Sequence, residues 1–316
     1  MNLALKFALT ALLVGILATL PWWGSAVLIQ FGINFLILAT LAQSWNIIGG
    51  FTGYPSFGNS VFYGLGGYGV AIAMVHFQLS FAVGLVFGVV LAALFAFLLG
   101  LPVLRLRGHY FAIATLGLAE VMTAIVSNLE IAGRNVGLVL PLLKGDTVFF
   151  ELSLALLVVT TITVAWISRS RFGFGLIAIR ENEEAAAVMA VNTTLYKILA
   201  FALCSVFAAI AGGIHAYWIT YLDPSSAFDI TLNVKMIIMA VFGGPGTIFG
   251  PVLGALVLSA ISEILASRVT SLASVFFGLV IVSAIVFMPR GLADLIRRFP
   301  QQGWRYFQEN IRVHRV

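Results

Sequence analysis

Charge is what this sequence has least of. Asp, Glu, Lys and Arg together make up 9% of its 316 residues, whereas a soluble domain carries about a quarter. Hydrophobic residues make up 61%, and the mean hydropathy is +1.08. The apolar residues come in long runs, which a bilayer accommodates and water does not. These features exclude a soluble fold and predict an all-α, polytopic transmembrane helical bundle.

Disulfides, metal-ligand clusters and a phosphate-binding loop are missing as well. The single cysteine, Cys204, lies in an apolar run, so it cannot form an intrachain disulfide and is expected to be buried. The four histidines are too scattered to suggest a metal site. No lysine follows a glycine, which excludes the G-x-x-x-x-G-K-[ST] loop. The chain therefore cannot be an ATPase of the P-loop type.

About ten apolar segments are of a length that crosses a bilayer, and glycines interrupt three of them, so some helices are expected to be broken or re-entrant. The predicted segments are 5–20, 26–48, 58–77, 80–103, 109–128, 148–167, 198–221, 232–248, 249–266 and 272–288. Residues 1–289 are thus expected to form one transmembrane domain. Residues 290–316 form a basic tail with interspersed apolar residues, which is typical of a cytoplasmic interfacial helix.

The distribution of Lys and Arg predicts the orientation. With segment 168–197 on the cytoplasmic side, thirteen of the 17 basic residues lie inside, three lie clearly outside, and Lys235 lies near the outer face. Both termini are then cytoplasmic. The longest external loop, about 129 to 147, is too short for a ligand-binding domain. A solute must therefore be captured by the spans or delivered by another protein.

A glycine-rich stretch follows the second predicted span. Three glycines and a proline within 49–55 are expected to break the helix, and the glycines within 58–69 allow helix backbones to approach closely. Residues 64–69 match G-x-G-x-x-G, but no strand precedes them, so this is no dinucleotide fingerprint. Two interpretations stay open: close helix packing, or a broken helix that lines a solute path. In either case polar groups would come from Asn46, Ser56 and Asn59.

Glu120 lies about halfway along the predicted span 109–128. A charged side chain at that depth costs on the order of 2.5–3.5 kcal/mol. We therefore expect Glu120 to face the bundle interior, paired or protonated, either on a translocation path or in a structural hydrogen bond. Further along, the sequence GGPG at 243–246 cannot continue a helix, which predicts a tight reversal or a break.

Residues 168–197 form the largest polar segment inside the chain. Within them, ENEEAAAVMAVN (181–192) combines high helical propensity with acidic residues in the first turns, where the helix dipole favours them. A solvated loop is one interpretation. The favoured one is a short amphipathic helix that docks into a groove on a cytoplasmic partner and moves the two attached spans.

Glu184-Ala185-Ala186-x-x-x-Ala190 resembles the E-A-A-x-x-x-G signature of the membrane subunits of bacterial ABC importers. In that family the segment is the coupling helix that contacts the ATPase. Ala190 stands where the family usually has glycine, which is a departure in the turn that ends the helix. The resemblance implies a coupling role for Arg180, Glu181, Glu183, Glu184, Ala185, Ala186 and Ala190.

Four stretches in order resemble the LivM-type permease of branched-chain amino-acid importers, and with their spans they cover most of residues 41–290. They are SWNIIGGFTGYPSFGNSVFYGLGGY, RLRGHYFAIATLGLAE, AIRENEEAAAVMAVN and FGGPGTIFGPVLGA. Tyr54-Pro55 and the outer-loop residues 132–135 depart from the usual pattern. The resemblance implies a non-catalytic, multi-pass subunit of the bacterial inner membrane that conducts branched-chain, hydrophobic amino acids. It needs no cofactor of its own, because ATP is used by partner subunits.

The implied partners are two ATPase subunits, a second homologous permease chain and a periplasmic or extracellular solute-binding protein, with membrane lipid around them and no nucleic acid. Two alternatives stay open. One is a urea or amide importer of the same branch, which differs in its substrate. A secondary transporter driven by protons or sodium would need ionisable groups near the midplane, for which Glu120 is the only clear acidic candidate.

Overall fold

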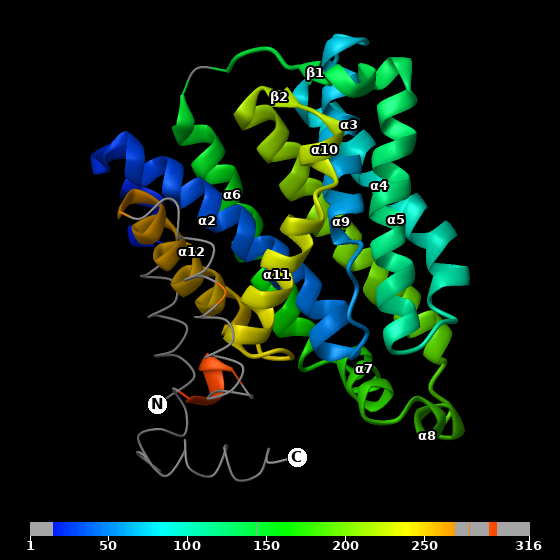
Figure 1. Ribbon diagram of the computed structural model, residues 1–316. Coiled ribbons are helices and arrows are strands. Elements are labelled where there is room, and N and C mark those ends of the chain that lie inside the picture. Colours follow the sequence, from blue (N-terminus) through cyan, green and yellow to red (C-terminus); the bar gives the residue numbers. More distant parts are fainter. Residues whose placement is uncertain (1–14, 144, 269–277, 279–290, 296–316) are drawn as a thin grey trace.

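Long apolar helices make up most of the structure. The computed structural model describes residues 15–143, 145–268, 278 and 291–295 (Figure 1). The described elements are α2 (Ala26–Trp45), η1 (Asn46–Phe51), α3 (Asn59–Val75), α4 (Phe81–Val103), α5 (His109–Asn128), η2 (Glu130–Ala132), η3 (Arg134–Val136), β1 (Leu138–Val139), α6 (Asp146–Ile167), α7 (Arg171–Glu181), α8 (Glu183–Val188), α9 (Thr193–Ile219), β2 (Tyr221–Leu222), α10 (Pro224–Ala227), α11 (Ile230–Gly243) and α12 (Gly250–Arg268). The all-α polytopic bundle expected from composition is confirmed.

Six helical segments in the described part are long and apolar enough to cross a membrane: Ala26–Phe51, Phe81–Val103, His109–Asn128, Asp146–Ile167, Thr193–Ile219 and Pro224–Gly243. Two shorter apolar helices, Asn59–Val75 and Gly250–Leu265, correspond to two of the glycine-interrupted segments. The predicted spans 5–20 and 272–288 and the tail 290–316 lie largely or wholly outside the described residues. By length and composition the described part therefore gives six spans rather than about ten.

One predicted boundary is wrong. The span expected to run to residue 248 ends at Gly243, where α11 stops. Gly244 (φ 120°) and Gly246 (φ 75°) adopt backbone conformations that residues with a side chain rarely adopt. The chain reverses there and enters α12 at Gly250. The sharp turn predicted for the GGPG sequence is thus confirmed, and it cuts the preceding span short.

The centre of the bundle is α3, packed most extensively against α4 and α9. Glycines let these backbones meet. A Cβ atom at Gly66 would overlap the backbone of Ala209 on α9, and one at Gly212 on α9 would overlap the backbone of Tyr63. Gly69 and Gly88 bring α3 and α4 together in the same way. In this part of the glycine-rich stretch the structure supports close helix packing.

The two ends of the bundle differ. At one end β1 pairs antiparallel with β2, with Leu138 opposite Leu222, so that the loop after α5 is joined to the loop after α9. At the other end α7 and α8 project from the bundle as a bent pair between α6 and α9 (Figure 1). Most of segment 168–197 therefore forms two separate short helices, whereas its last residues, from Thr193 on, are the beginning of α9.

The packing of α3 on α9 predicts that Gly66→Ala destabilises the chain. The added methyl group meets the backbone of Ala209, which cannot rotate away, so the free energy of unfolding should fall by about 1–3 kcal/mol. Thermal unfolding of the purified chain in detergent measures this. Gly100→Ala is the matched control, because its Cβ would lie 3.4 Å from Leu104 Cδ1 and 3.5 Å from Phe201 Cδ1, an ordinary contact. Equal melting temperatures for both variants would contradict the packing described here.

Candidate functional site

The polar segment folds as two helices because two side chains cap them. Ser170 Oγ accepts a hydrogen bond from Gly173 N at 3.1 Å and begins α7. Asn182 has an extended backbone (φ −162°, ψ 110°), and its Oδ1 accepts bonds from Glu184 N and Ala185 N at 3.0 Å, which begins α8. Asn182 therefore separates α7 from α8 and sets the bend between them.

Helix α8 ends in a Schellman motif around Ala190. Ala190 N donates to Ala187 O and Val191 N donates to Ala186 O, both at 3.1 Å. This motif requires a left-handed residue, and Ala190 has φ 61°. The signature that this segment resembles has glycine at the same position, so the turn geometry is kept here by an alanine in a strained conformation.

One face of α8 packs against the bundle and the other is exposed to solvent. Ala186 is buried against the bundle, whereas Glu184 and Ala185 are exposed. Val188 is 86% exposed and Met189 is 79% exposed. Two large apolar side chains thus stand in solvent at the tip of the projecting unit, next to the acidic first turn.

Arg180 ties α7 to the broken end of α2. Its Nη1 donates to Gly50 O at 3.0 Å, and its Nη2 lies 3.0 Å from Glu181 Oε1. A Cβ at Gly53 would lie 2.7 Å from Arg180 Cγ, and one at Gly246 would lie 2.8 Å from Nη1. The arginine side chain therefore passes between two glycines that belong to different sequence motifs.

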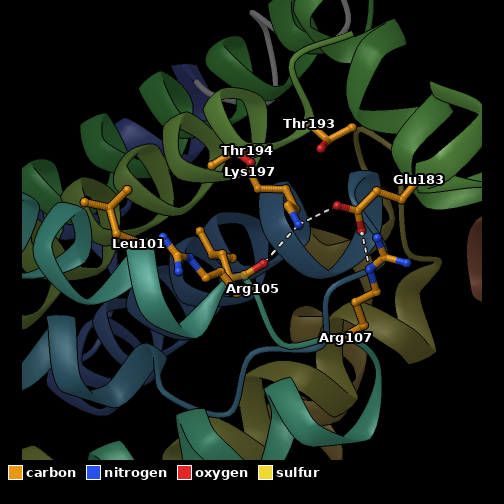
Figure 2. Close-up of a pocket in the computed structure, with 8 residues that line it drawn as sticks. Leu101, Arg105, Arg107, Glu183, Thr193, Thr194 and Lys197 are labelled. Atoms are coloured by element: carbon orange, nitrogen blue, oxygen red, sulfur yellow. Dashed lines mark hydrogen bonds and ion pairs between the residues drawn. The ribbon is translucent and has the colours of Figure 1, made fainter. Parts of the chain in front are cut away.

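A second link is built around Lys197, a lysine that is 4% exposed (Figure 2). Its Nζ donates to Glu183 Oε1 at 2.7 Å, and to Tyr54 Oη and Leu104 O at 3.0 Å. The Tyr54 hydroxyl in turn donates to Glu183 Oε2. Tyr54 follows η1, Leu104 ends α4, Glu183 begins α8 and Lys197 lies in the first turns of α9. Four segments thus converge on one ammonium group.

Arg107 extends this cluster to the surface. Its Nε lies 3.6 Å from Glu183 Oε2, and its Nη1 donates to Glu184 Oε1 at 3.0 Å. A cavity of about 350 Å³ opens beside the cluster. Its lining residues, most of them labelled in Figure 2, are Leu101, Leu104, Arg105, Arg107, Glu183, Thr193, Thr194 and Lys197.

Protonation within the cluster follows from its contacts. Burial raises the pKa of Tyr54 well above its usual range, and the hydrogen bond to Glu183 raises it further, so the phenol stays neutral. Burial alone would raise the pKa of Glu183 too. The hydrogen bonds from Lys197 and Tyr54 outweigh it, and the pKa lies below its ordinary value. The carboxylate is therefore ionised and paired with a buried cation.

The end of α2 is wound as a π-helix, η1, and is joined to the reversal after α11. Asn46 Nδ2 donates to Thr247 O at 2.9 Å, and Gly246 N donates to Asn46 Oδ1 at 2.7 Å. Gln43 Nε2 donates to Ile248 O at 2.7 Å. The expected break of the second helix is thus a change of winding at Asn46, a feature often found at functional sites.

The other polar residues of the glycine-rich stretch are also packed inside. Ser56 Oγ accepts from Gly58 N at 3.3 Å, and its carbonyl accepts from Trp45 Nε1 at 2.8 Å. Asn59 Nδ2 donates to the thiol of Cys204 at 3.0 Å, and Cys204 is buried as expected. Asn46, Ser56 and Asn59 are each fully buried and line no open path in this conformation.

The expectation that Glu120 faces the bundle interior is wrong, whereas a place on a translocation path stays a prediction. The side chain lies on the exposed face of α5 and not in the interior of this chain. The reason is the position of α5 at the edge of the bundle, where it turns only Phe111, Thr115, Ala119, Met122 and Val126 inward. In the part of the chain that the structure describes, the Glu120 carboxylate has no hydrogen bond or ion pair.

Sequence reasoning identified Glu183 and Arg180 but missed the residues that hold them. Tyr54 and Lys197 are 143 positions apart, and Arg107 comes from a third segment. The one local signal was Lys197 itself, a lysine that directly precedes the apolar run 198–221 and is rarely buried without a partner. No spacing rule connects it to Tyr54.

The chain is similar to permease proteins of known transport systems. The family model described as "Branched-chain amino acid transport system / permease component" matches residues 27–285. The high-affinity branched-chain amino acid transport system permease protein LivM is 29% identical in Salmonella typhimurium and 28% identical in Escherichia coli; each match covers 92% of this chain and 76% of the relative. The autoinducer 2 import system permease protein LsrC of Yersinia pseudotuberculosis is 29% identical over 70% of this chain and 68% of the relative. No solved structure matches the chain.

The cluster predicts that Lys197→Met is strongly destabilising. It leaves the Glu183 carboxylate without its buried cation, which should lower the free energy of unfolding by on the order of 3 kcal/mol in thermal unfolding of the purified chain. The double variant Lys197→Met/Glu183→Leu should recover most of this loss, because an apolar pair replaces the ion pair. Arg107→Gln, at an exposed and solvent-screened bridge, should lower the melting temperature far less than Lys197→Met. A single Lys197→Met variant as stable as the wild type would contradict the assigned pairing.

The Schellman motif predicts that Ala190→Gly stabilises α8. Removing the left-handed strain should gain about 1 kcal/mol and slow hydrogen exchange of the α8 amides about fivefold. Ala187→Gly, inside the same helix, should cost about 1 kcal/mol and speed exchange. If Ala190→Gly and Ala187→Gly changed the hydrogen-exchange rates of the α8 amides in the same direction, residue 190 would not be left-handed in solution.

Proposed function

Because the chain belongs to the permease component family of branched-chain amino acid transport systems, we propose that it is the membrane permease subunit of an ATP-binding-cassette importer that forms half of a translocation path for branched-chain amino acids. The family match over residues 27–285 carries this proposal. It is supported by the six apolar spans and by the projecting α7–α8 unit between two of them.

In this function α8 is the coupling helix. Its tip presents Val188 and Met189 to solvent, beside the exposed carboxylate of Glu184. Two adjacent exposed apolar side chains at the tip of a projecting helix fit a groove on an ATPase subunit. Arg180, Glu181, Glu183, Ala185, Ala186 and Ala190 then form, cap and anchor the docking unit.

Two anchors pass movement of α8 into the bundle. Arg180 bonds to Gly50 in η1, and Glu183 bonds to Tyr54 just after it. The same π-helix is joined through Asn46 to the reversal at 246–247. A displacement of α8 by the ATPase would be passed to the ends of α2 and α11 through this hydrogen-bonded network.

The remaining partners follow from this assignment. Two ATPase subunits use the ATP, so this chain is non-catalytic and carries no cofactor. A second, homologous permease chain completes the path, and a periplasmic or extracellular solute-binding protein delivers the solute. We place α7 and α8 on the cytoplasmic side of the bacterial inner membrane, with both termini cytoplasmic and about ten membrane segments in the whole chain.

The proposed substrate rests on the names of the relatives. The LivM relatives support branched-chain amino acids, and the LsrC relatives show that similar permeases are named for autoinducer 2.

Purification of the intact complex, followed by reconstitution into proteoliposomes, tests both the importer function and the substrate. We expect P-loop subunits and a sister permease to copurify and ATP to drive uptake of leucine, isoleucine and valine. ATP-driven uptake of urea, amides or autoinducer 2 instead would replace the substrate. A chain that purifies alone and transports on an ion gradient would overturn the function.

The exposed tip predicts that Val188→Asp uncouples the importer without unfolding it. The side chain is 86% exposed, so the substitution is tolerated by the fold, but a charge in a docking groove should weaken ATPase binding by about tenfold or more, ~1.4 kcal/mol. Copurification of the ATPase subunits and ATP-driven uptake both report this. Val188→Leu, which keeps the apolar contact, should behave as the wild type. Normal ATP-driven uptake by Val188→Asp would show that α8 does not contact the ATPase subunits.

A further inference from the structure

The cavity beside the Lys197 cluster carries an excess of positive charge. Three of its charged lining residues are cations and one is an acid: in this order, Arg105, Arg107, Lys197 and Glu183. Glu183 and Lys197 neutralise each other across 2.7 Å. The two arginines remain, and they lie on opposite sides of Lys197 (Figure 2). The cavity therefore favours an anion.

The two arginines differ in how far their charge is compensated. Arg105 is exposed, and its guanidinium has no ion pair or hydrogen bond within the described part of the chain. Arg107 bonds to Glu184 Oε1 at 3.0 Å, but the side chain of Glu184 is 80% exposed, so water screens this bridge. The other carboxylate near Arg107 is already paired with Lys197. One guanidinium is thus free to bind an anion, and the other is only weakly held.

Two hydroxyl groups add to the polar lining. Thr193 and Thr194 begin α9, and among the described residues their hydroxyls have no hydrogen-bond partner. Guanidinium and hydroxyl groups are donors that bind phosphate oxygens. The cavity volume of about 350 Å³ is at the lower end of the range for small-ligand sites, about 300–1,000 Å³. This volume and these donors suit a phosphate ester.

The cavity lies at the level of lipid headgroups. Helix α4 has 23 residues and is about 35 Å long at 1.5 Å per residue, enough to cross a ~30 Å hydrocarbon layer. Arg105 and Arg107 follow in the turn between α4 and α5. Their guanidinium groups therefore stand at the membrane surface, where phospholipids carry their phosphate groups.

An apolar stripe on α4 leads from the hydrocarbon layer to this cavity. Val90, Leu94, Leu98 and Leu101 are all exposed and follow one another at intervals of three or four residues, so they share one face of the helix. Leu101 also lines the cavity. A lipid with its phosphate in the cavity can lay its acyl chain along this stripe. A soluble phosphate ester would use only the polar half of the arrangement.

We propose that the cavity at the start of α9 binds the phosphate group of an anionic phospholipid, whose acyl chain lies along the 90–101 face of α4. Zwitterionic lipids carry the same phosphate, but their ammonium group would lie beside Arg105 and Arg107, which repel it. The site needs neither the solute nor ATP. Because Arg107 also contacts Glu184, the bound lipid lies next to the first turn of α8.

Lipid titration followed by native mass spectrometry tests the site. The complex, as it purifies from the membrane in detergent, is titrated with phosphatidylglycerol or with phosphatidylcholine. We expect phosphatidylglycerol to bind about fivefold or more tightly than phosphatidylcholine, and Arg105→Gln and Arg107→Gln each to weaken its binding about fivefold. Arg169→Gln removes an exposed arginine that follows α6 and does not line the cavity, so this matched control should bind phosphatidylglycerol as the wild type does.

Two results would show that no specific lipid site exists. One is equal binding of the two lipids. The other is an equal loss of phosphatidylglycerol binding in Arg105→Gln and Arg169→Gln, which would indicate general attraction to a basic surface.

Competition distinguishes the two sources of phosphate. sn-Glycerol 3-phosphate in about tenfold excess should leave phosphatidylglycerol bound, because it lacks the acyl chain that contacts α4. Displacement at that ratio would assign the cavity to a soluble phosphate ester and overturn the lipid assignment.

Discussion

A lysine held out of water must keep its charge compensated, and Lys197 is the point on which the rest of the site depends. Its ammonium is satisfied by Glu183, Tyr54 and Leu104 together, so α4, α8, α9 and the segment after η1 cannot separate without exposing an unpaired buried charge. The ion pair fixes where α8 sits. Arg180, bonded to Gly50 and passing between Gly53 and Gly246, adds a second fixed point on the same π-helix. The coupling role proposed for α8 thus rests on two polar anchors in a protein with few charged residues.

The glycines of this chain serve two distinct purposes. Within α3 they let the backbones of α4 and α9 approach, which builds a rigid centre. Around η1 and the reversal after α11 they make room for the Arg180 side chain and for left-handed turns. A rigid centre beside a π-wound, hydrogen-bonded junction is what a mechanical coupling needs, because the junction can shift while the centre stays packed.

Much of this could be predicted from the sequence, and the reasons for the remainder are physical. Apolar run length gave the helical bundle, and four ordered motifs led to the permease family, since both signals are local. The capped helix at Glu183–Val188 followed from its alanines and acids, but the cap Asn182 and the bend were not foreseen. The Lys197–Glu183–Tyr54 cluster joins residues up to 143 positions apart, which no periodicity reports. Glu120 was expected in the interior because a charge at mid-depth is costly, but that argument does not say which face of α5 packs on the bundle, and the face with Phe111, Thr115 and Ala119 does.

The central claim is that α8 and the end of α2 move as one body when the ATPase acts. Spin labels at Val188, at Phe57 in the loop that follows η1, and at Ile162 on the exposed face of α6 measure this in the reconstituted complex. Distances are taken by pulsed electron resonance with and without a non-hydrolysable ATP analogue. The account predicts that the 188–57 distance distribution stays the same while the 57–162 distance changes with nucleotide. A 188–57 distance that changes while 57–162 stays fixed would show that α8 swings freely, and would contradict transmission through Arg180 and the Lys197 cluster.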